Sequence, residues 1–99
     1  MADAPVLEDV LCVLRGHKDS ARAVGVELVG VVGSVARGDA RSDSDVDIAY
    51  DVLGQASLWD LGGLLMELQE ALGRKVDLID REMIKPERRA FMERTLVPL

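Results

Sequence analysis

The chain has 99 residues, with 12 Lys or Arg against 18 Asp or Glu, so its formal net charge is -6. A chain of this length buries roughly two thirds of its surface, enough for one core, and we predict a single domain over residues 1–99. The acidic balance argues against broad binding to nucleic-acid backbone, which depends on Lys and Arg. No apolar run approaches the roughly 20 residues of a membrane-spanning helix, and the start of the chain lacks the features of a signal peptide. We therefore expect a cytoplasmic protein.

The first half of the chain predicts a helix, a buried strand and a loop. Residues 6–24 place apolar side chains at helical spacing, with Cys12 among those expected in the core. Cys12 is also the only cysteine, so no disulfide can form within the chain. Residues 26–32 are a β-branched, almost wholly apolar run, which predicts a strand buried on both faces. Residues 34–44 are rich in Gly, Ser, Asp and Arg and predict a loop containing at most one short helical turn.

The second half predicts two more strands and two more helices. Residues 45–51 alternate with a period of two, which indicates a strand with one solvated face. Residues 58–72 carry a helical leucine stripe, with Ser57 as its cap and Gly73 as its end. The predicted order of elements ends with a short strand over 75–80, a helix over 82–95 and a frayed terminus. The fold class is therefore α/β or α+β, a small mixed sheet covered by helices.

Two phosphate or metal motifs can be excluded for the loop. Residues 33–38 carry the outer glycines of a Walker A motif, but Asp39 and Ala40 stand where Lys and Ser or Thr are required. The spacing of the acidic residues over 43–47 resembles an EF-hand, yet Ile48 replaces the turn glycine and Gly54 the bidentate glutamate.

The remaining pattern is a Gly-Ser pair followed by two aspartates on one strand. Asp45 and Asp47 are two residues apart, so their carboxylates point to the same face of a strand. Two such charges a few Å apart repel by about 4 kcal/mol at an effective dielectric near 20, and Mg²⁺ is the partner that best relieves this repulsion. Gly33 and Ser34 could approach phosphate oxygens closely. Asp77 interrupts a later apolar strand and could supply a third carboxylate.

This part of the sequence resembles a known family. Residues 33–47 read Gly-Ser-Val-Ala-Arg-Gly-Asp-Ala-Arg-Ser-Asp-Ser-Asp-Val-Asp, and residues 73–78 read Gly-Arg-Lys-Val-Asp-Leu. Both stretches are similar to the signature of the minimal nucleotidyltransferases of the polymerase-beta-like superfamily.

The resemblance implies roles for individual residues. Asp45 and Asp47 resemble the metal-binding pair, and Asp77 resembles the third acidic residue, which can hold metal or act as general base. Gly33 and Ser34 resemble the triphosphate-binding loop. Further candidate nucleotide contacts in the same stretch are Arg37, Arg41 and Ser44. Each arginine could instead form a weak surface pair with Asp39 or Asp43.

The resemblance also implies a reaction and a partner. Members of this family are commonly antitoxins of HEPN-domain ribonuclease toxins, with which they form hetero-oligomers. The implied activity is Mg²⁺-dependent transfer of AMP from ATP to a tyrosine hydroxyl of the toxin, with two metal ions. Two alternatives stay open: a nucleotidyltransferase acting on a small molecule such as an aminoglycoside, and an antitoxin that neutralises its toxin by binding alone. A nucleic-acid polymerase is disfavoured, because a template groove requires a basic lining.

Overall fold

The computed structural model describes residues 3–99, which form a four-stranded mixed sheet. The strands are β1 (Val26–Val32), β2 (Val46–Val52), β3 (Val76–Asp80) and β4 (Val97–Pro98), in the spatial order β3-β2-β1-β4. β1 pairs antiparallel with both β2 and β4, whereas β2 and β3 run parallel. The predicted mixed sheet is confirmed. None of the helices within residues 3–99 has both the length and the apolar character to span a bilayer.

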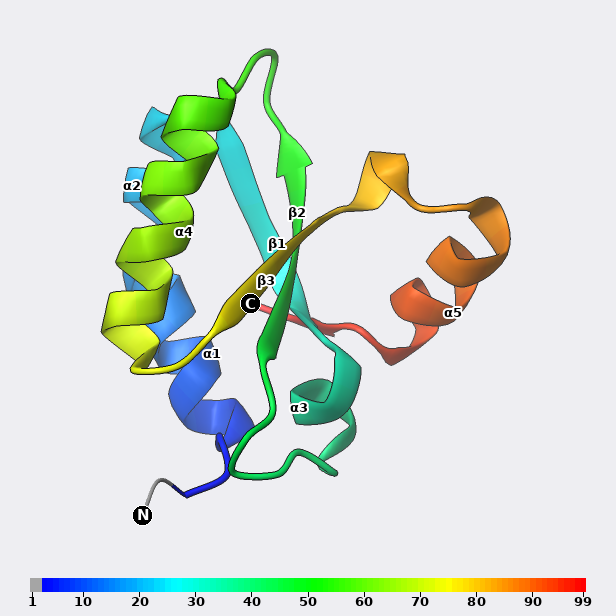
Figure 1. The fold of residues 1–99 in the computed structure, drawn as a ribbon. Coiled ribbons are helices and arrows are strands. Elements are labelled where there is room, and N and C mark those ends of the chain that lie inside the picture. The colour runs from blue at the N-terminus through cyan, green and yellow to red at the C-terminus, as the bar shows by residue number, and fades with distance from the viewer. Residues whose placement is uncertain (1–2) are drawn as a thin grey trace.

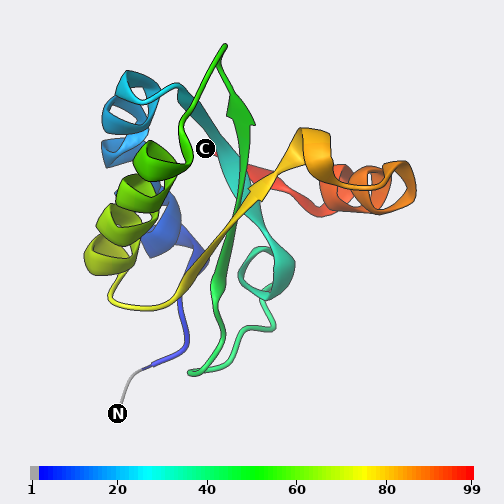
Figure 2. The same ribbon diagram turned by 45° about the horizontal axis from the view of Figure 1, so that its top comes forward.

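Helices cover both faces of this sheet (Figures 1 and 2). One face carries α1 (Leu7–Gly16), α2 (Lys18–Ala23) and α4 (Leu58–Leu72). The other carries α5 (Pro86–Thr95), while α3 (Gly33–Arg37) follows the end of β1 and packs its buried Val35 into the larger hydrophobic cluster. A short 3-10 turn over residues 81–83 connects β3 to the segment that leads into α5. The sheet is thus the middle layer, and each face has its own hydrophobic cluster.

The larger cluster lies beneath α1, α2 and α4. Its largest fully buried side chains include Leu14, Leu28, Ile48 and Leu68. Replacing Leu68 by alanine is expected to lower the free energy of unfolding by about 3 kcal/mol, because the cavity left in a packed core closes only partly. Chemical denaturation of Leu68→Ala beside Leu58→Ala tests this, since Leu58 is 87% exposed and its truncation should cost little.

Local signals placed α4 correctly. The helix spans the predicted residues, the Ser57 hydroxyl accepts a hydrogen bond from the Asp60 amide at 3.0 Å, and Gly73 ends the helix with φ +68°.

The first predicted helix, by contrast, is two helices. It breaks at His17, directly after Gly16, and the His17 Nδ1 lies 2.6 Å from the Glu67 carboxylate of α4. Cys12 is exposed, so its expected place in the core is wrong.

Three further expectations need correction, two of them because distant segments return to the sheet. The Asp47 face of β2 is not fully solvated, since Ala49 is completely buried in a cluster with Met92 of α5. The last helix begins at Pro86 rather than at residue 82. The C-terminus does not fray, because β4 pairs with β1 beside Gly30, where a Cβ atom would lie 2.4 Å from the Val97 carbonyl oxygen.

The turn after β3 is tied to β2 by an ion pair. Arg81 donates to both carboxylate oxygens of Asp51, with Nε to Oδ1 at 2.8 Å. This hydrogen-bonded arginine lowers the pKa of Asp51 below its ordinary value. The pair therefore stabilises the fold above the unfolded-state pKa of about 4, and that stability disappears as pH falls through the lower native pKa. We expect Asp51→Asn to cost about 1 kcal/mol at pH 7 and progressively less below about pH 4 in acid unfolding titrations.

Candidate active site

The candidate site forms where β1 ends and where β2 and its parallel neighbour β3 begin. In the antiparallel register Asp47 is opposite Val32, the residue before Gly33, and in the parallel register it is opposite Asp77. Partners on adjacent strands point to the same face, about 5 Å apart, so Asp47 and Asp77 project together. Asp45 lies one residue before β2, with Val46 fully buried behind it. The fold therefore brings these carboxylates to the Gly-Ser loop, as the sequence predicts.

Gly33 is in contact with the central carboxylate. Its backbone has φ +74°, and a Cβ atom there would lie 2.3 Å from Asp47 Oδ2. Only glycine satisfies both conditions, because it adopts positive φ without strain and leaves room for the carboxylate. Ser34 follows as the second residue of α3, and its hydroxyl has no hydrogen-bond partner within residues 3–99. The Gly-Ser turn and the carboxylate cluster are thus adjacent.

The carboxylates repel one another. The pKa of Asp47 is raised above its ordinary value, first by burial and then by the negative charges of Asp77 and Asp45. The nearby positive charge of Arg37 partly opposes this rise. A divalent cation would relieve the repulsion, and Mg²⁺ characteristically binds one or two protein carboxylates and completes its shell with water and substrate phosphates. Within residues 3–99 no three His, Cys, Asp or Glu side chains already enclose a metal position. The donor set fits Mg²⁺ bound by these carboxylates, with the rest of its shell filled by water or, when nucleotide is bound, by phosphate oxygens.

Three other predicted contacts are less closely tied to the cluster. Arg37 Nε lies 3.5 Å from Asp39 Oδ2, and both side chains are largely exposed. The backbone N–H of Arg41 donates to the Ser44 hydroxyl at 2.8 Å, which closes the turn that leads to Asp45. In this arrangement Ser44 shapes the loop, and of these three residues it is Arg37 whose positive charge acts to lower the pKa of Asp47.

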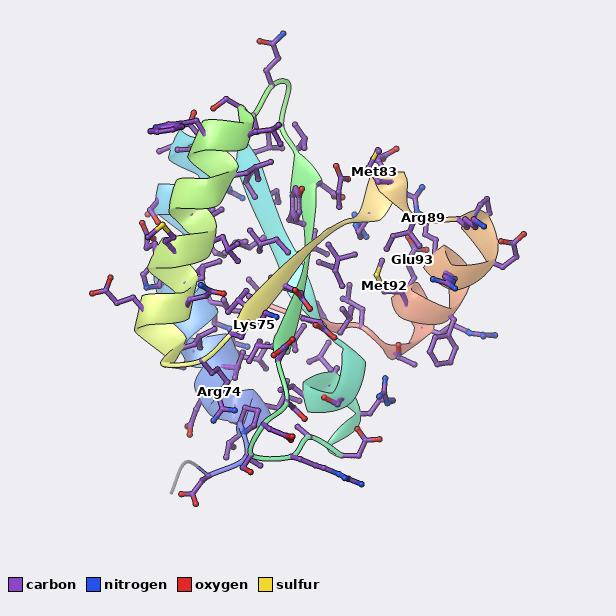
Figure 3. All side chains as sticks on the ribbon, viewed as in Figure 1. Arg74, Lys75, Met83, Arg89, Met92 and Glu93 are labelled. Carbon is purple, nitrogen blue, oxygen red and sulfur yellow. The ribbon has the colours of Figure 1, made fainter. Side chains whose placement is uncertain are left out.

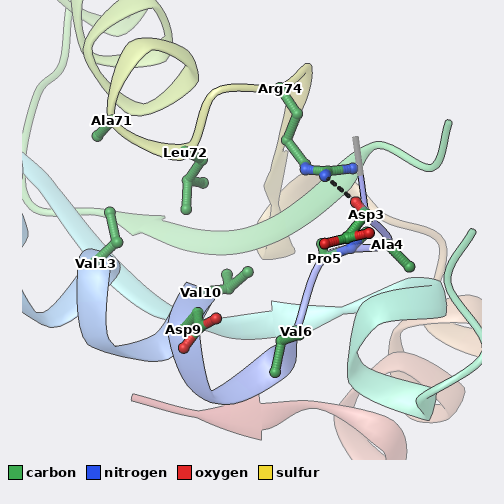
Figure 4. Close-up of a pocket in the computed structure, with 10 residues that line it drawn as sticks. All are labelled: Asp3, Ala4, Pro5, Val6, Asp9, Val10, Val13, Ala71, Leu72 and Arg74. Atoms are coloured by element: carbon green, nitrogen blue, oxygen red, sulfur yellow. Dashed lines mark hydrogen bonds between the residues drawn. The ribbon is translucent and has the colours of Figure 1, made fainter. Parts of the chain in front are cut away.

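A hollow elsewhere on the surface is not the candidate site. It has a volume of about 330 Å³ and lies between the N-terminal segment, α1 and the end of α4 (Figure 4). Arg74 on its rim was not singled out from the sequence, although it is three residues before Asp77. Its guanidinium hydrogen-bonds main-chain oxygens of the segment preceding Asp45. Only the folded chain reveals this role, because the partners are about 30 residues away.

Comparisons with known proteins agree with this geometry. Residues 11–97 match the nucleotidyltransferase domain family. Protein adenylyltransferase MntA of Thermococcus cleftensis is 40% identical over 80 residues, which cover 80% of this chain and 81% of that protein. A solved structure of a minimal nucleotidyltransferase is 32% identical and superposes with a TM-score of 0.83, covering 96% of this chain and 97% of the other.

A more distant solved structure shares the fold alone. It is a toxin-antitoxin complex with AMP-PNP, 24% identical to this chain, with a TM-score of 0.57 over 79% of this chain and 59% of the other. The family match spans the Gly-Ser turn, the two aspartates and Asp77, all of which the fold brings to one end of the sheet. The chain therefore belongs to the nucleotidyltransferase domain family and is a minimal nucleotidyltransferase.

Proposed function

We propose that this chain, acting as a single domain, transfers AMP from ATP to a tyrosine hydroxyl of a toxin protein and thereby acts as its antitoxin. The observation that carries the proposal is the contact between Gly33 and the Asp47 carboxylate, with Asp77 beside it in register. This arrangement gives one place where phosphate oxygens, metal and an attacking hydroxyl can meet. The similarity to a protein adenylyltransferase supports AMP as the transferred group.

Each residue of the site has a task in this reaction. Gly33 and Ser34 present a backbone N–H and a free hydroxyl to the triphosphate. Asp45, Asp47 and Asp77 are the residues that would hold Mg²⁺, and two such ions would neutralise charge on the phosphates. In this proposal Arg37 and Arg41 of the same loop supply positive charge to the phosphates. Ser44 contributes through the turn that it closes before Asp45.

The chemical step is an in-line displacement. The acceptor oxygen forms a bond to the α-phosphorus, the bond between the α-phosphorus and the bridging oxygen breaks, and pyrophosphate departs with that oxygen. The phenolic hydroxyl has an ordinary pKa near 10, so its proton must be removed as the bond forms, and in this proposal Asp77 accepts it. The carboxylates lie at an open end of the sheet rather than in the hollow of Figure 4, so a protein surface can cover them.

The partner that we propose is a HEPN-domain ribonuclease toxin, with which the chain forms a hetero-oligomer. The distant structural neighbour is itself a toxin-antitoxin complex with AMP-PNP, which supports a toxin as the partner and an adenine nucleotide as the substrate. Modification of a small molecule is less well supported, because the relative that is 40% identical is a protein adenylyltransferase.

Incubation with ATP labelled at the α- or γ-phosphate tests the proposal. In the presence of Mg²⁺ and the toxin encoded beside this chain, α-label should become attached to the toxin and γ-label should appear only in pyrophosphate. Transfer of γ-label would indicate phosphorylation and overturn the proposed reaction. A stable complex with neither label on the toxin would indicate neutralisation by binding alone.

A further inference from the structure

Arg74 joins three segments that are far apart in the sequence. It lies between α4 and β3, three residues before Asp77 (Figure 3). Its Nη1 donates to the carbonyl oxygens of Ser42 at 3.3 Å and Ser44 at 3.4 Å, and its Nη2 donates to the carbonyl oxygen of Asp3 at 2.7 Å (Figure 4). All three acceptors are main-chain atoms. The arginine therefore fixes backbone, not a side chain.

The backbone that it fixes is the one that carries Asp45. On one side of Asp45, the Ser44 carbonyl is held by Arg74; on the other, the Val46 N–H donates to the Lys75 carbonyl at 3.0 Å. Asp45 itself precedes β2 and has no ladder partner in the sheet. Its position relative to Asp77 is therefore set by two neighbouring residues, Arg74 and Lys75, on the segment that continues into β3.

The residue type suits this task. Within residues 3–99 Arg74 has no carboxylate within 4.0 Å, so none of its charge is committed to an ion pair. A guanidinium offers five donors in a rigid fork, which allows one side chain to bond carbonyls on two segments at once. A lysine has its three donors on a single nitrogen and can reach only part of this set.

We propose that Arg74 is a positioning residue, which sets the spacing between Asp45 and Asp77 and so tunes metal binding at the carboxylate cluster. The inference rests on the proposed metal-binding role of Asp45. A residue that orients a metal ligand typically changes metal affinity by 10- to 100-fold when it is removed. Since Arg74 acts through the main chain, we expect the lower end of this range for Arg74→Ala, about tenfold.

Titration with Mn²⁺, followed by electron paramagnetic resonance on the nucleotide-free protein, tests the inference without relying on turnover. The variants are Arg74→Ala, Arg74→Lys and Asp45→Asn, with Arg22→Ala as the matched control. Arg22 is an exposed arginine of α2 that pairs with Glu27, away from the site. We expect Arg74→Ala to weaken Mn²⁺ binding about tenfold and Arg74→Lys to recover part of it. Arg22→Ala should bind as the wild type does.

Two further measurements separate positioning from general stability. The Mg²⁺ activation curve of Arg74→Ala, at saturating ATP and well below its melting temperature, should shift to higher Mg²⁺ while excess Mg²⁺ restores most of kcat. Amide exchange at Val46 should accelerate in the same variant.

The outcomes distinguish this inference from the proposed site itself. Mn²⁺ affinity that falls in Asp45→Asn but not in Arg74→Ala overturns the positioning role and keeps the metal site. Unchanged affinity in both variants overturns the metal site, and the role of Arg74 with it. If Arg74→Ala does not fold, wild-type affinity in Arg74→Lys together with slow exchange at Val46 would contradict the proposal.

Discussion

Replacing Asp45 and Asp47 together by asparagine is expected to lower the rate of AMP transfer by about a thousandfold or more. Asp47 contacts the Gly-Ser turn and Asp45 lies near enough for its charge to raise the pKa of Asp47, so without both the site loses ligands that would hold Mg²⁺ against the triphosphate. A loss of several kcal/mol of transition-state stabilisation corresponds to this factor, since each 1.4 kcal/mol is tenfold. Single-turnover transfer of α-label from ATP measures it.

The same substitution should not destabilise the metal-free fold. Burial and the charges of Asp77 and Asp45 raise the pKa of Asp47, so the ionised carboxylate is unfavourable in the native state at neutral pH. Removing that charge should leave the melting temperature unchanged or higher.

The matched control for the loss of activity is Asp43→Asn, an exposed aspartate of the same loop, which should keep wild-type activity. Full activity in the double variant, or equal loss in Asp43→Asn, would contradict the assignment.

Replacing Gly33 by alanine is the second large effect that we expect. The new Cβ would lie 2.3 Å from Asp47 Oδ2, so the carboxylate must move. Displacement of a reacting or ligating group by about 1 Å can cost a hundredfold in rate, and we expect a loss of about that size. Steady-state kinetics should show it mainly in kcat, because the triphosphate can still contact the rest of the turn.

Gly38→Ala is the matched control for Gly33→Ala. Gly38 also has positive φ, +81°, but a Cβ atom there meets nothing within 4 Å. Both variants therefore carry a backbone strain of about 1–2 kcal/mol, whereas only Gly33→Ala moves Asp47. Equal losses of activity in the two variants would show that backbone strain alone is responsible, and would remove the argument for a contact between turn and carboxylate.

Much of the fold could be predicted because its signals are local. The cap at Ser57, the leucine stripe and Gly73 define α4 within the chain's own neighbouring residues. The site could be predicted for a similar reason. Asp47 lies beside the Gly-Ser turn once β1 and β2 pair, whereas Asp45 precedes β2 and is positioned by the neighbouring residues Arg74 and Lys75.

The features that were missed depend on contacts between distant segments. The burial of Ala49 requires α5 to return over β2, and the ordering of the C-terminus requires β4 to pair with β1 beside Gly30. The break at His17 leaves its imidazole beside Glu67, fifty residues away. No pattern within a short window encodes these contacts. The one local hint is Gly30, which bears on the pairing of β4 with β1, since a glycine within a strand indicates that another backbone approaches closely there.

AMP transfer by the carboxylate cluster is tested most directly by mass spectrometry of the toxin after incubation with ATP, Mg²⁺ and either the wild-type chain or Asp45→Asn/Asp47→Asn. We expect one or more adenylate units on a tyrosine of the toxin with the wild type, and an unmodified toxin with the variant. An unmodified toxin with a folded, ATP-binding wild-type chain, or equal modification by the variant, would contradict the proposed chemistry.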